Sequence, residues 1–97
     1  MLIPEELSIN KVEKIYKKIK PYINLTPLKK ASRILDNDFN TNIYLKFEFL
    51  QKAGFFKSRG AINNILSSDN KDLENGITAV SAGNHAIAVA YAANKFN

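Results

Sequence analysis

The chain contains no cysteine and a single histidine, His85, among its 97 residues. Without cysteine there can be no disulfide and no thiolate metal site, and one histidine excludes a metal site built from several histidines of this sequence. No run of eighteen or more apolar residues is present, which predicts no membrane span. The first residues also lack the basic and apolar regions of a signal peptide. We therefore expect a cytoplasmic protein.

Glycine is also scarce, with four residues of which no two are adjacent: Gly54, Gly60, Gly76 and Gly83. A glycine-rich loop that could cradle a phosphate group is therefore absent from this sequence.

Positive charge is in excess, with fourteen Lys or Arg against nine Asp or Glu. Five lysines fall between residues 11 and 20. They belong to a segment in which Ile9, Val12 and Ile15 recur at helical spacing. The pattern predicts an amphipathic helix with a solvated lysine face rather than a nucleic-acid patch, because exposed aromatic residues are not interleaved with the charge. We expect no nucleic-acid partner.

Hydrophobic periodicity and turn residues predict alternating helices and strands. Pro21 should end the first helix, and the order β-α-β-α that follows favours an α/β class with a parallel sheet. The predicted elements are helix 8–20, an extended stretch 24–28, a short polar helix 30–36, strand 42–48, helix 58–66, strand 77–81 and helix 84–95.

Two short motifs carry the chemistry. Lys57 lies at a predicted loop-to-helix junction after Phe56, and further along the chain the residues Ser81-Ala82-Gly83-Asn84-His85 join a predicted strand to a helix. Alone, such a lysine is usually a surface residue with a solvated ammonium, and Asn84 and His85 could be an ordinary N-cap and first-turn residue. Free N–H groups at a helix start suit an anion, however. Together the motifs indicate a covalent cofactor site.

The order and spacing of these motifs resemble the start of the serine/threonine dehydratases. The matching residues are Thr26-Pro27-Leu28, Leu45-Lys46-Phe47-Glu48, Gln51, the run from Gly54 to Ala61 and the run from Ser81 to Ala86. Members of this family are pyridoxal-phosphate enzymes of the tryptophan-synthase-β-like fold, also called fold type II. The resemblance implies a parallel sheet with flanking helices, residues 1–50 in the large domain and residues 51–97 at the start of the small domain.

The resemblance also implies an activity and a set of roles. Lys57 would form the Schiff base with pyridoxal phosphate and serve as the catalytic base, Phe56 would lie against the cofactor ring, and Asn84 would bind its phenolic oxygen. The substrate carboxylate would be held by Ser81, Ala82, Gly83, Asn84 and His85. Such an enzyme deaminates L-threonine or L-serine to 2-oxobutanoate or pyruvate and ammonia, as in isoleucine biosynthesis. Arg59 is expected to be structural and to pair with a carboxylate of the same domain.

Three positions depart from the family pattern or discriminate within it. Phe55 stands where the family usually has serine, and Ile87 replaces a glutamine; both changes put the fine substrate contacts in doubt. Serine racemases carry a serine at the position of Ala82, on the cofactor face opposite the lysine. The methyl group of Ala82 cannot exchange a proton, so a lyase is predicted rather than a racemase.

Other functions remain open. The substrate could be another β-hydroxy amino acid such as 3-hydroxyaspartate, the enzyme could be racemase-like, or the chain could be a non-catalytic α/β module. Because the family's catalytic unit is far longer than 97 residues, we expect the chain to be an N-terminal fragment that is inactive alone. The complete protein is expected to be a homo-oligomer.

Overall fold

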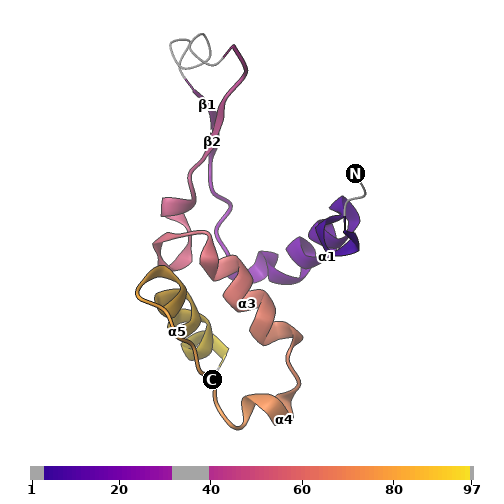
Figure 1. The fold of residues 1–97 in the computed structure, drawn as a ribbon, viewed down its shortest axis with the longest axis vertical. Coiled ribbons are helices and arrows are strands. Elements are labelled where there is room, and N and C mark those ends of the chain that lie inside the picture. Colours follow the sequence, from indigo (N-terminus) through magenta and orange to yellow (C-terminus); the bar gives the residue numbers. More distant parts are fainter. Residues whose placement is uncertain (1–3, 32–39, 97) are drawn as a thin grey trace.

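The computed structural model describes residues 4–31 and 40–96. Helices predominate among these residues, and the molecule is elongated (Figure 1). The main elements are α1 (Ile9–Ile19), β1 (Leu28–Lys30), β2 (Tyr44–Lys46), α3 (Lys57–Ser67), α4 (Asn70–Leu73) and α5 (Asn84–Phe96). Short 3-10 helices occupy Glu5–Leu7, Lys20–Tyr22, Glu48–Leu50 and Lys52–Gly54.

Helix α1 forms as its pattern predicts. The side chain of Ser8 caps it by accepting a hydrogen bond of 3.3 Å from the backbone N–H of Lys11, which satisfies one of the free donors of the first turn. The helix ends at Ile19, and Pro21 then lies in the following 3-10 turn. The five lysines between residues 11 and 20 are exposed, so this face of α1 is solvated.

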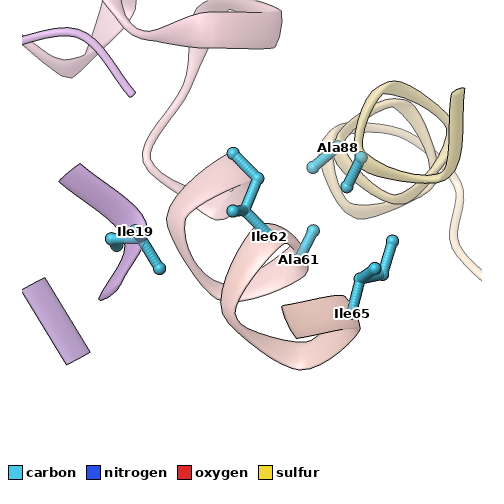
Figure 2. Packing of buried hydrophobic residues seen from close by; sticks show 6 residues of the cluster. Ile19, Ala61, Ile62, Ile65 and Ala88 are labelled. Carbon is cyan, nitrogen blue, oxygen red and sulfur yellow. The ribbon is translucent and has the colours of Figure 1, made fainter. Parts of the chain in front are cut away.

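Helix α3 lies at the centre of the core. Figure 2 shows its side chains in the middle, with Ile19 of α1 on one side and Ala88 of α5 on the other. Ile62 is completely buried, and the alanines of α5 allow that helix to approach α3 closely. The buried apolar residues are Ile19, Ala61, Ile62, Ile65, Ala88 and Ala92. This core joins residues from both sides of the domain boundary predicted at residue 50.

Strands β1 and β2 form an antiparallel hairpin that extends away from the helices (Figure 1). Leu28 pairs with Lys46 and Lys30 with Tyr44. The predicted strand 42–48 is thus confirmed at its centre. The predicted helix 30–36 is wrong at Lys30, which belongs to β1 because its partner strand fixes it there; residues 32–36 of that prediction lie outside the described residues.

The predicted strand 77–81 is not formed. Val80 is fully exposed, and within the part of the chain that the structure describes no strand pairs with this segment. A β-strand is defined by its neighbour's hydrogen bonds, and here none is available. The described residues therefore show no parallel sheet, only the antiparallel hairpin. Helix α4, where no element was predicted from the sequence, begins at Asn70, shortly after α3 ends at Ser67.

Candidate functional site

Lys57 is the first residue of α3, directly after a tight turn. Its side chain is exposed and forms no hydrogen bond or ion pair with any described residue. The neighbouring Phe56 has 62% of its surface exposed. An unpartnered amine thus lies beside an uncovered aromatic ring.

A cavity of about 340 Å³ lies at this point of the molecule. Its lining brings the two sequence motifs together, because His85 of α5 faces the same space as Phe56 and Lys57. Close packing of α5 on α3 is what creates this proximity. The complete lining is Phe56, Lys57, Arg59, Gly60, Ala61 and His85.

The remaining residues of the second motif lie at the start of α5 but do not line this cavity. Ser81, Ala82 and Asn84 are exposed, and the hydroxyl of Ser81 accepts a hydrogen bond of 3.2 Å from the backbone N–H of Gly83. Helix α5 begins at Asn84, so the N–H groups of its first turn have no partner within the helix. They are available to an anion, as expected of this junction from its sequence.

Arg59 pairs with the carboxylate of Glu48. The Arg59 guanidinium donates two hydrogen bonds, from Nε to Oε2 at 2.7 Å and from Nη2 to Oε1 at 2.8 Å. The hydroxyl of the buried Thr26 donates to Oε1 at 2.5 Å, and the Lys46 ammonium donates to the Thr26 carbonyl at 2.6 Å. The prediction that Arg59 pairs with a carboxylate is confirmed, but Glu48 lies on the other side of the domain boundary expected at residue 50, not in the same domain as predicted. The pair fastens the first turn of α3 to the base of the hairpin.

This ion pair shifts both ionisable groups. The hydrogen bonds from Arg59, opposed by burial and helped by Thr26, lower the pKa of Glu48 from 4.5 to about 2. The hydrogen bond to Glu48 raises the pKa of Arg59. Both groups are therefore charged at neutral pH, and bidentate geometry makes this pair stronger than a typical surface ion pair.

Sequence reasoning missed two buried polar residues near Lys57, Gln51 and Ser58. Gln51 is 4% exposed and Ser58 is completely buried. Glutamine and serine are usually exposed. The backbone carbonyl and N–H groups that surround Gln51 and Ser58 are brought together only in the folded turn. Gln51 was part of the recognised motif, but its spacing carried no sign of this burial.

An exposed lysine amine, an exposed aromatic ring and His85 from the first turn of α5 thus line one cavity. Residues 19–97 match the family model of the pyridoxal-phosphate dependent enzymes, and the chain belongs to this family.

The biosynthetic L-threonine dehydratase IlvA of Staphylococcus saprophyticus is 41% identical over the whole chain, which corresponds to 23% of that protein. IlvA of Lactococcus lactis is 42% identical over 94% of the chain and 22% of its own length. The catabolic L-threonine dehydratase TdcB of Staphylococcus aureus is 41% identical over 90% of the chain and 25% of its own length. The chain thus spans about a quarter of the curated relatives that it matches.

Two solved structures resemble the fold. Maize serine racemase superimposes with a TM-score of 0.79 and 38% identity, over 91% of this chain and 27% of that one. The threonine deaminase of T.th. gives a TM-score of 0.73 and 43% identity, over 92% of this chain and 31% of its own. These similarities confirm the predicted α/β, fold type II class, although the described residues alone form no parallel sheet.

The residues at the cavity fit pyridoxal phosphate, the cofactor of this family. A lysine amine is the group that binds its aldehyde, and the amine of Lys57 is free to do so among the described residues. The exposed ring of Phe56 offers an apolar surface for an aromatic ring.

No cluster of three or more potential metal ligands is found in residues 4–31 and 40–96, and none of the helices there is long and apolar enough to cross a membrane.

Proposed function

We propose that this chain contributes the cofactor lysine and the substrate-carboxylate loop of an ammonia-lyase that acts on L-threonine or L-serine. The observation that carries the proposal is the shared cavity of Phe56, Lys57 and His85, in a chain that is 41% identical to a threonine dehydratase along its full length. The products are 2-oxobutanoate from threonine, or pyruvate from serine, with ammonia.

Each proposed residue has a distinct task. The Lys57 amine binds the cofactor aldehyde, and once released by the substrate it takes the Cα proton as a general base. Phe56 orients the cofactor ring, and the Asn84 amide donates to its phenolic oxygen. When bound, pyridoxal phosphate supplies an electron-withdrawing ring that spreads the charge left at Cα.

The loop before α5 supplies the substrate-binding groups. We infer that the carboxylate is bound by the region Ser81, Ala82, Gly83, Asn84 and His85, through backbone N–H groups at the start of α5. The positive end of the helix dipole favours a negative charge at this place. Since His85 also lines the cavity of Lys57, a carboxylate bound here lies near the proposed base.

The test is a chimeric enzyme. The matched segment of the S. saprophyticus dehydratase is replaced by these 97 residues, and 2-oxobutanoate formation from L-threonine is measured. We expect activity that Lys57→Ala abolishes and that Lys71→Ala, at an exposed lysine of α4, preserves. A folded chimera with unchanged activity in Lys57→Ala would refute the assignment. Parallel assays with L-serine and 3-hydroxyaspartate determine the preferred substrate.

Racemisation is the second candidate, favoured by the structural similarity to maize serine racemase. Ala82 argues against it, because a methyl group offers no second proton-transfer group. We expect the chimera to produce no D-serine from L-serine, and we expect Ala82→Ser to be the change that introduces it. D-serine formation by the unmodified chimera would overturn the lyase proposal.

The complete protein is further proposed to be a cytoplasmic homo-oligomer. Similarity to bacterial dehydratases of amino-acid metabolism supports the location. The exposed apolar side chains of Ile9 and Val12 on α1, 69% and 49% exposed, support an additional contact surface. Analytical ultracentrifugation of the chimera tests the oligomeric state. The non-catalytic alternative predicts a chimera that folds without any activity.

A further inference from the structure

The turn that precedes Lys57, residues 51–56, has an uncommon backbone. Ala53 and the following Gly54 both have positive φ angles, 58° and 80°. Glycine adopts this region readily, but an alanine does so only where surrounding contacts hold it. The contacts that hold this turn are made by the two buried polar side chains that sequence reasoning missed.

Gln51 anchors the start of the turn. Its Oε1 accepts hydrogen bonds from the backbone N–H of Asn24 at 2.8 Å and of Lys52 at 3.0 Å. Its Nε2 donates to the Asn24 carbonyl at 2.9 Å. The buried amide therefore fastens the turn to the segment that leaves α1, in a geometry that resembles a pair of strand hydrogen bonds.

Ser58 anchors the end of the turn. Its hydroxyl lies within hydrogen-bond distance of two carbonyl oxygens, that of Lys52 at 2.7 Å and that of Phe55 at 2.9 Å. A hydroxyl has one hydrogen, so it donates to both in alternation or as a shared bond. Because Ser58 is completely buried, water cannot replace it without local opening. Its hydroxyl thus connects the first turn of α3 to both ends of the segment 52–55.

We propose that Ser58 is a positioning residue for the Lys57 amine. The Lys57 side chain has no partner among the described residues, so contacts of its own do not fix where its amine points. That position is set by the backbone at the start of α3, which the Ser58 hydroxyl ties to the turn. The inference rests on the proposed function of Lys57 as the cofactor lysine. It states that Ser58 affects the reactivity of the Lys57 amine and not only the stability of the fold.

The test compares three variants of the 97-residue chain. Ser58→Ala removes the hydroxyl, Ser58→Thr retains one, and Ser68→Ala is a matched control. Ser68 donates a hydrogen bond of 2.9 Å to the Asn64 carbonyl at the far end of the same helix. Each variant is mixed with pyridoxal phosphate and reduced with borohydride, and peptide mass spectrometry measures the capture at Lys57 relative to the exposed Lys95. Amide exchange of α3 is recorded in parallel.

We expect the wild-type chain to favour Lys57 over Lys95. Ser58→Ala should lower this preference about two- to tenfold, the equivalent of one hydrogen bond. Ser58→Thr should restore the preference, and Ser68→Ala should leave it unchanged.

The contrary outcomes are distinguishable. Equal capture at Lys57 and Lys95 in the wild type would remove the cofactor role of Lys57, and the inference with it. A wild-type preference that survives Ser58→Ala would overturn the inference alone. The same follows if Ser68→Ala lowers the preference as much as Ser58→Ala, or if Ser58→Thr fails to restore it while α3 stays protected from exchange.

Discussion

Replacing Glu48 by glutamine should destabilise the fold at neutral pH but have little effect in strong acid. The pKa of Glu48 is about 2 in the folded chain and 4.5 in an unperturbed carboxyl. Between these values the unfolded chain binds more protons than the folded chain, so acid favours unfolding. The stabilisation from the Glu48 charge is therefore complete above about pH 4.5 and is lost as the pH falls toward 2.

The magnitude follows from the size of the shift. A difference of this size between the two pKa values corresponds to about 3 kcal/mol of unfolding free energy as an upper bound. The side chains of Arg59 and Glu48 keep 27% and 16% of their surface exposed, so water screens part of the interaction. We therefore expect Glu48→Gln to cost about 1–2 kcal/mol near pH 7.

The assay is urea unfolding followed by circular dichroism at several pH values between 7 and 2.5. Glu13→Gln is the matched control, because Glu13 is exposed on α1 and makes no ion pair with a described residue. The free-energy difference between the wild type and Glu48→Gln should shrink below about pH 4.5, while the difference for Glu13→Gln stays small throughout. A Glu48→Gln difference that is constant with pH would refute the reasoning.

Four further substitutions test the packing and the turn. Ile62→Ala should lower the unfolding free energy by about 2–5 kcal/mol because the side chain is fully buried, whereas Leu28→Ala, at a 64% exposed position, should change it by less than about 0.5 kcal/mol in the same urea titrations. Gly54→Ala should be destabilising by about 1 kcal/mol because its φ is 80°. Gly60→Ala should instead raise the melting temperature, since the added methyl group meets open space and Gly60 lies within α3. Equal melting temperatures for the two glycine variants would contradict this account.

The helices could be predicted closely because their signals are local. Apolar spacing, Ser8 and Pro21 are enough to place α1 within a residue or so, and α3 and α5 follow the predictions equally well. The strand predicted at 77–81 failed for a physical reason. Helix hydrogen bonds are made within the segment, but a strand depends on a neighbour that the segment's own sequence does not specify. The pairing of Lys30 in β1 was missed for the same reason.

The residue types of the candidate site could be predicted from the sequence, but the turn that holds the start of α3 could not. The two motifs predicted one site from Phe56, Lys57 and residues 81–85, and of these Phe56, Lys57 and His85 line one cavity. Nothing in the sequence placed a positive φ at Ala53, since alanine has no preference for it. Without that turn, the burial of Gln51 and Ser58 cannot be foreseen, because their partners are backbone groups brought together only by the fold.

The structure around Lys57 combines a fixed backbone with a free amine. Two other lysines use their ammonium groups in hydrogen bonds: Lys46 donates to a carbonyl at 2.6 Å and Lys18 to the Ser67 hydroxyl at 2.5 Å. At Lys57, the hydrogen bonds are made by the neighbouring residues instead, through the Ser58 hydroxyl and the Arg59 guanidinium. Such an arrangement fixes the backbone at Lys57 and leaves its amine unpaired among the described residues, which is consistent with the proposed role of this lysine.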